Sequence, residues 1–424
     1  MIASKVRKPV PISHLNAWRM RRQFLDRPFG SKNIVDLIKS IGWIYSPGCS
    51  TPYLSLWARM SPFRAEDLNR LVFDDHKLLQ LETLRGCTML VPRDQANIAL
   101  RIRTRTFTEL SKQARQQMPI TDAEMEKLKG AILKSLHSGP KTSEQLQQML
   151  PPDLIRDFGA DLKRIGLTNS LSLGINLLKE EGKVLKQQSK RRLDIMDYSF
   201  VLTSSILPEA DPFSLRLEEA CAQLANQYFK AEAPARAKDF AWWAGINVTD
   251  AIRGGGEIKP KLVPVSVEGT ADEFLISESE LDDFLAFEPQ DFVINFIPYR
   301  DTYLKGQREI LNRFISSEHA DKPFSRWKGK LINDPLATII VNGRVVGVWE
   351  WSEDGDDIDL LLFDSIAKSA ERAIHKRASE LAGFIRSNLG EVRLQGVDYG
   401  PHQTTGIHDL KAFWGKGAQA DSRV

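Results

Sequence analysis

The stretch between Thr121 and Leu202 constrains the fold most, because it combines three helix patterns with a pair of strands. Apolar residues recur at helical spacing in three short runs, each bounded by cap residues, prolines or glycines. These runs lie at residues 121–136, 142–150 and 170–181, and the strands are expected at 183–188 and 195–202. Three helices followed by a hairpin predict a winged helix, in which the third helix can enter a DNA groove.

The hairpin of this winged helix is strongly basic. Its first strand and its turn carry five cations before the first acid, Asp194. The five are Lys183, Lys186, Lys190, Arg191 and Arg192. We expect such a wing to contact DNA phosphates. A short basic hairpin can also be a solvated edge that avoids pairing with other strands, and this alternative stays open.

Length and composition are those of an ordinary globular protein. The 424 residues suggest about three domains, and the 42% hydrophobic and 27% charged fractions suit buried cores. No apolar run reaches the roughly 20 residues of a membrane span, and residues 1–14 lack the apolar core of an export signal. We therefore expect a cytoplasmic protein that does not contact a membrane.

Metal and disulfide sites are not expected. Cys49, Cys87 and Cys221 have no Cys-x-x-Cys spacing, and the seven histidines form no known ligand motif. We predict no metal and no cofactor.

Positive and negative charges are segregated along the chain. Cations gather in the wing and in two further groups, whereas acids gather at 268–283 and 350–359. The further cations expected at a DNA surface are Arg101, Arg103, Arg105, Arg253, Lys259 and Lys261. Segregation predicts one positive face, although two solvated surfaces would give the same pattern.

The flanking regions repeat the helix-and-hairpin theme. Helices are expected at 14–26, 33–41 and 66–73 with strands at 78–84 and 87–91, which together predict a first winged helix. Helices at 215–229, 235–244 and from 247 onward, with a strand at 261–267, predict a third. The glycine run at 254–256 lacks the lysine of a phosphate loop, so we interpret it as a helix end.

The C-terminal part has a β character. Strands are expected at 292–297, 337–341, 344–351, 358–363 and 392–396, and a long helix at 365–388. Asn342-Gly343 is a strong hairpin signal. The predicted class is α+β, with three tandem winged-helix domains and a small C-terminal β-barrel-like domain containing a long helix. The expected domains are residues 1–118, 119–208, 209–288 and 289–424.

Several strings in this order resemble the AlkZ-like (YcaQ-like) winged-helix DNA glycosylases. They are Arg19–Leu25, Thr51–Arg59, Arg85–Pro92, Asp239–Gly245, Phe296–Gly306 and Val341–Trp349. The resemblance covers nearly the whole chain, and it rests on the order and spacing of these strings. It implies excision of alkylated or crosslinked purines from DNA. It also implies a Gln-x-Gln or Gln-x-Asp motif after the second helix, whose oxygens face the sugar and the attacking water.

The chain departs from this pattern at the implied motif. The matching slot reads Trp43-Ile44-Tyr45, and Met89 replaces the histidine that the resemblance implies in the first wing. Neither aromatic ring supplies an amide or a carboxylate. Three carboxylates are candidate substitutes, although a cap, turn or surface role is the alternative for each: Asp36, Asp94 and Asp301.

Two functions follow. The first is a DNA glycosylase with a degenerate motif, in which Trp43 and Tyr45 stack on an exposed base. The second is a DNA-binding protein without catalysis on the same scaffold. In both, the expected partner is double-stranded DNA, including damaged DNA, and the protein is expected to be a monomer. The resemblance adds Arg300 and Lys305 to the expected DNA contacts.

Overall fold

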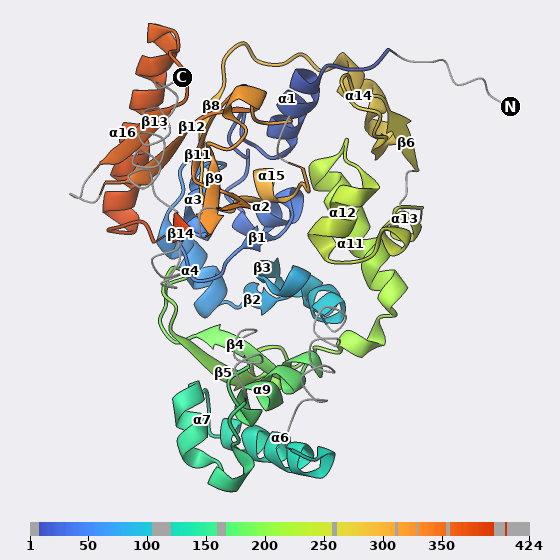
Figure 1. The fold of residues 1–424 in the computed structure, drawn as a ribbon, viewed down its shortest axis with the longest axis vertical. Coiled ribbons are helices and arrows are strands. Elements are labelled where there is room, and N and C mark those ends of the chain that lie inside the picture. The colour runs from blue at the N-terminus through green and yellow to red at the C-terminus, as the bar shows by residue number, and fades with distance from the viewer. Residues whose placement is uncertain are drawn as a thin grey trace, which may run out of the picture.

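The computed structural model describes residues 8–103, 120–158, 167–256, 261–309, 313–327, 330–352, 357–393 and 403–404. Helices and small antiparallel sheets alternate along these ranges, in agreement with the predicted α+β class. The first elements occupy the middle of the molecule, residues 120–202 form one end, and the C-terminal sheet and long helix form the other (Figure 1). No helix in the described ranges is long and apolar enough to cross a membrane.

The N-terminal region consists of helices packed on a three-stranded sheet of order β1-β3-β2. Its elements are α1 (Ile12–Arg22), α2 (Ile34–Ile41), β1 (Ile44–Tyr45), α3 (Thr51–Trp57), α4 (Ala65–Phe73), β2 (Leu78–Glu82), η1 (Leu84–Gly86), β3 (Thr88–Pro92) and η2 (Arg93–Gln95). Asn33 caps α2 by accepting hydrogen bonds from the backbone N–H groups of Val35 and Asp36. Strand β1 pairs with β3, which places Tyr45 directly opposite Met89.

The segment 120–202 contains α6 (Asp122–Leu136), α7 (Ser143–Met149), η3 (Pro152–Leu154), α9 (Ser170–Glu180), β4 (Val184–Gln188) and β5 (Tyr198–Leu202). Thr121, Thr142 and Asn169 each begin a capping box, which fixes where the three α-helices start. Their apolar faces form a core made only of residues from this segment.

The turn of the β4–β5 hairpin packs against the N-terminal region. Leu193 is fully buried there, in one core with residues of α2 and α4, and its backbone N–H donates to the Tyr53 hydroxyl at 2.9 Å. The strand predicted from residue 195 therefore begins only at Tyr198. The residues before it belong to the turn that Leu193 anchors, and they are not part of the paired strands β4 and β5.

Residues 203–286 continue with helices and a second hairpin. Their elements are α10 (Thr203–Ile206), η4 (Pro212–Ser214), α11 (Leu217–Glu232), α12 (Ala237–Ala244), α13 (Val248–Gly256), β6 (Leu262–Val265), β7 (Phe274–Ser277), η5 (Glu278–Glu280) and α14 (Leu281–Ala286). The glycine run ends α13, and Gly254 allows close packing on α11, since a Cβ there would lie 3.2 Å from the Cys221 carbonyl oxygen. Residues of α11 and α12 share one core with α1, β2 and β3.

The C-terminal region holds a sheet of order β13-β12-β11-β8 and a second sheet of order β10-β9-β14. Its elements are β8 (Ile294–Ile297), α15 (Thr302–Lys305), η6 (Ser317–His319), β9 (Phe324–Trp327), β10 (Lys330–Pro335), β11 (Thr338–Val341), β12 (Arg344–Trp351), β13 (Ile358–Leu362), α16 (Lys368–Asn388) and β14 (Gln403–Thr404). Asn342 and Gly343 have φ values of 49° and 79°, as expected for a two-residue hairpin turn.

The strand predicted at 392–396 is wrong in its described part. Residues 392 and 393 form no strand, because the backbone of Arg393 instead pairs with Ser50 ahead of α3. Residues 394–396 lie outside the described ranges.

A buried carboxylate joins the segment 120–202 to the central sheet. Glu82 accepts hydrogen bonds from Lys179 at 2.5 Å and from Arg103 at 3.0 Å. Burial opposes ionisation of Glu82, but the two cations lower its pKa to about 2.

We predict that Leu193→Ala destabilises the fold by about 2–5 kcal/mol, because it leaves a cavity in the core that receives the hairpin turn. Denaturant unfolding followed by circular dichroism measures the loss. The control is Met149→Ala in the same segment, where the side chain is 52% exposed and little change is expected. Equal effects of the two substitutions would contradict the anchoring role of Leu193.

A second prediction concerns acid unfolding. Because the folded pKa of Glu82 lies below its ordinary value of 4.5, its stabilising contribution is fully present above pH 4.5 and is lost as the pH falls toward 2. Glu82→Gln should cost about 3–5 kcal/mol at pH 7, since it leaves Lys179 and Arg103 without their carboxylate, and should flatten the pH dependence of the unfolding midpoint. Glu66→Gln, which removes an exposed pair with Arg191, is the control and should do neither.

Candidate functional site

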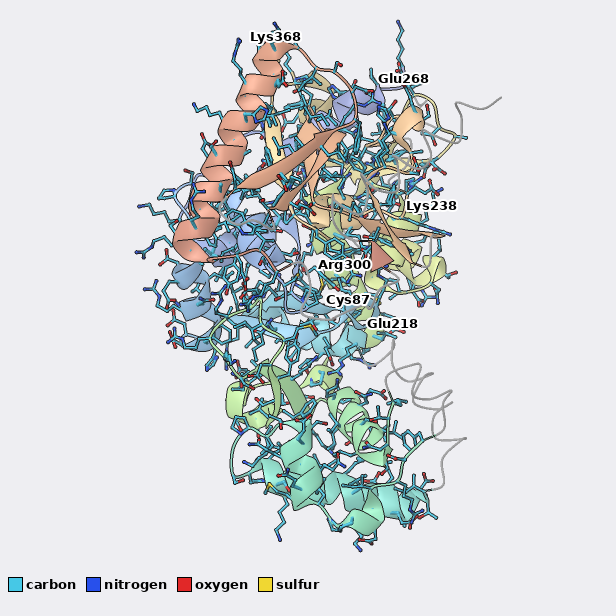
Figure 2. All side chains as sticks on the ribbon, turned by 60° about the vertical axis from the view of Figure 1, so that its left-hand side comes forward. Cys87, Glu218, Lys238, Glu268, Arg300 and Lys368 are labelled. Atoms are coloured by element: carbon cyan, nitrogen blue, oxygen red, sulfur yellow. The ribbon has the colours of Figure 1, made fainter. Side chains whose placement is uncertain are left out.

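A pocket of about 240 Å³ lies at the centre of the molecule, between the β1–β3 pair, η1, α12 and α15. The residues that line it are Tyr45, Leu84, Arg85, Cys87, Met89, Trp243, Arg300, Thr302 and Lys305. Figure 2 shows Arg300 and Cys87 close to each other near the middle of the molecule. Three of these residues are cations and none is an acid, so the pocket wall is cationic.

A buried carboxylate positions the α15 side of the pocket. Asp301 caps α15 by accepting from the Tyr303 backbone N–H at 2.9 Å. Its carboxylate is also bound by both terminal nitrogens of Arg59, at 2.7 and 2.8 Å, and by the Ser55 hydroxyl at 2.5 Å. Arg59 and Asp301 are both completely buried. This contact fixes where α15 begins and therefore where Arg300 and Lys305 lie.

A second carboxylate, Asp334, holds two pocket cations. Arg300 donates through Nε to Asp334 at 2.6 Å, and the Lys305 Nζ lies 3.0 Å from the other carboxylate oxygen. The Tyr299 hydroxyl also donates to Asp334, at 2.7 Å. Arg300 further donates to the Tyr45 hydroxyl. Asp334 thereby ties β10, the start of α15 and β1 into one hydrogen-bonded group.

These contacts set the charge state of the pocket. Burial opposes ionisation of Asp334, but Lys305 and Arg300 outweigh it and lower the pKa of the carboxyl group. Burial lowers the pKa of Lys305, and Asp334 counteracts part of that effect. For Arg300 burial is outweighed by Asp334, which raises its pKa. With Arg85 added, three cations face one carboxylate, so the pocket carries two net positive charges.

Arg85 differs from the other cations of the pocket. It has a positive φ of 52°, and its guanidinium carbon lies 3.9 Å from the centre of the Trp242 ring. Its Nε is buried and has no hydrogen-bond partner among the residues that the structure describes. Gly245, which ends α12 with a φ of 70°, permits this approach, since a Cβ there would lie 2.9 Å from Arg85 Cγ. Burial lowers the pKa of Arg85.

The predicted motif slot lies partly in this pocket. Tyr45 lines it, and its strand partner Met89 lines it too, so the two positions where the chain departs from the expected pattern share one site. Trp43 lies elsewhere, because its side chain is fully buried and donates from Nε1 to Gln95 at 2.7 Å. In this structure Trp43 therefore belongs to the core, and its stacking on a base stays a prediction.

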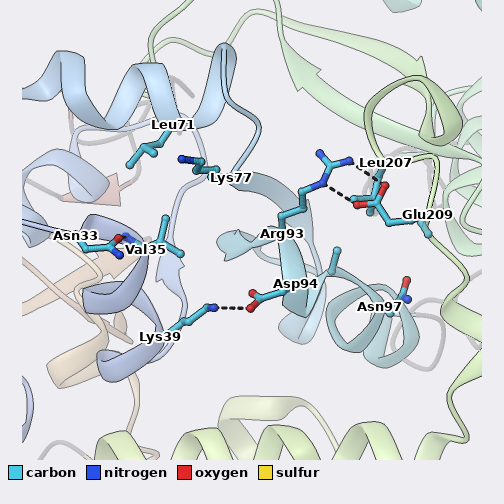
Figure 3. A pocket seen from close by; sticks show the side chains of 12 residues that line it. Asn33, Val35, Lys39, Leu71, Lys77, Arg93, Asp94, Asn97, Leu207 and Glu209 are labelled. Atoms are coloured by element: carbon cyan, nitrogen blue, oxygen red, sulfur yellow. Dashed lines mark hydrogen bonds and ion pairs between the residues drawn. The ribbon is translucent and has the colours of Figure 1, made fainter.

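The three candidate carboxylates have structural partners. Asp301 is buried against Arg59, as described, and Asp36 accepts from its own helix cap, Asn33, at 2.6 Å. Asp94 is 62% exposed and pairs with Lys39 at a larger pocket of about 630 Å³. Figure 3 shows this pair, and the ion pair of Arg93 with Glu209, on its wall. None of the three lines the central pocket.

The wing cations are held by neighbouring groups. Arg191 bridges to Glu66 at 3.2 Å and Asp74 at 2.7 Å, and Arg192 forms a double hydrogen bond with Asp194. The remaining three have these contacts: Lys183 with Glu181 at 2.7 Å, Lys190 with Asp197 at 3.9 Å, and Lys186 at 3.6 Å from the Tyr198 ring centre. Lys190 is the most exposed among Lys190, Arg191 and Arg192 in these ion pairs.

The other predicted cations are dispersed. Arg103 is buried on Glu82, Arg101 donates to the Leu215 carbonyl at 3.0 Å, and Arg253 lies 3.9 Å from Asp250. Lys261 is exposed ahead of β6. Arg105 and Lys259 lie outside the described residues. The structure thus gathers Arg300 and Lys305, together with Arg85, at one point and leaves the others apart.

Sequence reasoning missed Arg85, Trp242, Trp243 and Asp334 as parts of this site. Gly86 between two predicted strands indicated a turn at this point, but neither the positive φ of Arg85 nor its surroundings could be recognised from the sequence. Asp334 lies on a strand that the sequence did not predict. Among the described residues, no group of three or more His, Cys, Asp or Glu side chains is arranged to hold a metal ion.

Comparison with known proteins identifies the scaffold. The family model described as DNA glycosylase AlkZ-like matches residues 39–384, and the chain belongs to this family. Among solved structures it is similar to the DNA glycosylase AlkZ of Streptomyces sahachiroi, with 20% sequence identity and a TM-score of 0.67. The match covers 91% of this chain and 99% of that one. No curated protein matches the chain.

We predict that Asp334→Asn destabilises the protein by about 3–5 kcal/mol, because it leaves Arg300 and Lys305 without their carboxylate in a buried position. Thermal unfolding and denaturant titration measure the effect. Asp94→Asn is the matched control, since it breaks an exposed pair and should change stability by less than about 1 kcal/mol. A neutral effect of Asp334→Asn would show that the pocket does not depend on this group.

Proposed function

We propose that this chain is a DNA-binding protein on the glycosylase scaffold, and that it holds double-stranded DNA, including damaged DNA, over its central pocket. The observation that carries the proposal is the net positive charge at that pocket, where Arg85, Arg300 and Lys305 converge and one carboxylate, Asp334, pairs with the last two. Positive potential in a concave site attracts the phosphates of a duplex. Family membership makes DNA the expected ligand.

The architecture that we propose for this role has three winged helices and a barrel-like domain. The helix order and hairpins of residues 12–92, 122–202 and 217–277 support the winged helices, and the two C-terminal sheets with α15 support the barrel-like domain. The third helix of the middle module, α9, is buried along much of its length. The hairpin turn of the middle module offers Lys190, whose side chain is 64% exposed, as an accessible contact for a phosphate.

The same charges argue against excision of N7-alkylated purines by the route that the family pattern implies. Such a base is a cation, and two net positive charges in the pocket repel it. An oxocarbenium-like sugar also needs a nearby negative charge or oriented acceptor. Asp334 is already neutralised by two cations, and the Tyr45 hydroxyl accepts from Arg300. The geometry therefore favours binding without this chemistry.

Base excision is a second candidate, for one reason. Tyr45 and Met89, which occupy the expected motif positions, meet at the pocket wall. The Tyr45 hydroxyl, oriented by Arg300, is the group at this slot that can hydrogen-bond a water molecule. If the protein does excise a base, we expect that base to be neutral, because the positive charges of the pocket repel a cationic one.

We predict that the protein retards duplex DNA in gels and that DNA containing N7-methylguanine shows, after alkaline treatment, no more strand breaks than a protein-free control. Breaks above that control would overturn both the non-catalytic proposal and the electrostatic argument against cationic bases, whereas breaks only at a neutral lesion would favour the second candidate. DNA that is neither retarded nor cleaved would overturn both.

The salt dependence of binding tests the wing separately. Each phosphate contact contributes about 0.9 to the slope of log K against log salt concentration for duplex DNA, so Lys190→Ala should reduce the slope by about that amount. The control is Lys368→Ala, an exposed cation at the start of α16, far from the pocket (Figure 2). An unchanged slope in Lys190→Ala would exclude the wing tip from the interface.

A further inference from the structure

Arg85 is a partly buried cation that forms no ion pair with any acidic residue in the described ranges. Other buried arginines of the chain face a carboxylate: Arg19 faces Glu232, Arg59 faces Asp301 and Arg103 faces Glu82. Within the described part of the chain, no oxygen atom accepts a hydrogen bond from Arg85, and the face of Trp242 is its cationic contact. An uncompensated buried charge is costly, so a position of this kind calls for a reason.

The neighbours of Arg85 give that reason. Arg300 and Lys305 line the same pocket, and the one carboxylate among them, Asp334, already serves these two cations. Thr302 adds a hydroxyl group to the wall. The positive charge that Asp334 does not balance therefore lies on Arg85. An anion in the pocket would accept hydrogen bonds from the planar, forked guanidinium group of Arg85 and would also contact Arg300 and Lys305.

The remaining lining is apolar and aromatic. Leu84, Met89, Trp243 and the ring of Tyr45 form it, and the volume of about 240 Å³ exceeds that of a single inorganic anion. An anion attached to a flat apolar group matches both parts of the lining, since bases stack on aromatic side chains. A phosphate group carried by a nucleotide has this composition.

We propose that the central pocket binds one phosphate group of a DNA strand, with Arg85 as its main ligand, and admits the nucleotide attached to it. This inference rests on the proposed DNA-binding function and adds the chemical group that is bound. Residues of β1, β3, η1, α12 and α15 line the pocket, whose volume is about 240 Å³. A pocket of this small volume suits a phosphate at a strand end or on an unpaired nucleotide better than one in a continuous duplex.

Calorimetric titration of the full chain tests the proposal with three probes: inorganic phosphate, a thymidine dinucleotide bearing a 5′-phosphate, and the same dinucleotide with a 5′-hydroxyl. We expect all three to bind at one site, and Arg85→Gln to weaken each by about tenfold or more, the effect of losing a charge-assisted hydrogen bond. Tighter binding of the 5′-phosphorylated dinucleotide would assign the site to strand ends. Equal binding of both dinucleotides would assign it to the internal phosphodiester. Either result supports a phosphate site.

Arg377→Gln is the matched control. Arg377 also lies 3.9 Å from a tryptophan ring, that of Trp57, but it belongs to α16 and pairs with Glu380. Its loss should leave phosphate binding unchanged. Failure of wild-type protein to bind any of the three probes, or equal losses in the two variants, would overturn the proposal.

Stability distinguishes a ligand-binding arginine from a structural one. Because Arg85 has no carboxylate to lose, Arg85→Gln should leave the unfolding midpoint unchanged or raise it in the absence of phosphate, whereas a structural role predicts a lower midpoint. Arg85→Lys, which keeps the charge but not the forked geometry, should bind phosphate more tightly than Arg85→Gln and more weakly than wild type.

Duplex retardation, measured on the same preparations, separates the two proposals. If wild-type protein binds phosphate but no duplex, the DNA-binding proposal fails and the phosphate site stands. If it binds duplex DNA but none of the three probes, the phosphate site fails and the DNA-binding proposal stands.

Discussion

The contact between Arg59 and Asp301 is the constraint on which the central pocket depends. It joins the end of α3 to the start of α15, 242 residues further along the chain, and both side chains are completely buried. A buried ion pair of this kind requires accurate geometry, because either charge alone in the core would be strongly unfavourable. Asp301 also accepts from the Tyr303 backbone, so the same carboxylate determines where α15 begins. The positions of Arg300 and Lys305 follow from it.

The chemistry of the pocket follows from how its charges are compensated. Asp334 balances part of the charge of Arg300 and Lys305, while Arg85 rests on an aromatic face. A site with this balance is suited to anions and poorly suited to cationic bases. The family scaffold and the local electrostatics thus point to different properties. Membership of the family implies DNA as the ligand, and the charges of the pocket are the basis for our proposal that it receives a phosphate instead of an alkylated base.

Much of the local structure was predictable from the sequence, since caps and periodicity act over a few residues. Thr121 and the Asn342-Gly343 turn lie where their chemistry predicts, and Ser170 starts α9 as expected. Long-range contacts were not predictable in this way. The start of β5 was misplaced because Leu193 packs into a distant core, and nothing in the neighbourhood of Leu193 specifies that contact.

The candidate site was predictable only in part, for the same reason. Tyr45, Arg300 and Lys305 were identified from strings that resemble the family. Trp43 was assigned to the site although the core encloses it. Arg85 acquires its significance from Trp242, more than 150 positions away. Asp334 acquires its significance from Arg300, 34 positions away, and Arg300 in turn donates to Tyr45 in a distant part of the chain. Local patterns carry no information about such neighbours.

The segment 120–202 has a core of its own. Arg101, which precedes this segment in the chain, donates to the carbonyl of Leu215, which follows it, at 3.0 Å. The flanking parts on either side of it share a single core. In architectural terms the middle module resembles an insertion that is anchored at two points, the β4–β5 turn at Leu193 and the end of α9 at Lys179. Evolution could therefore vary its outer helices, α6 and α7, more freely than the hairpin and α9, because the body of the protein packs against the latter.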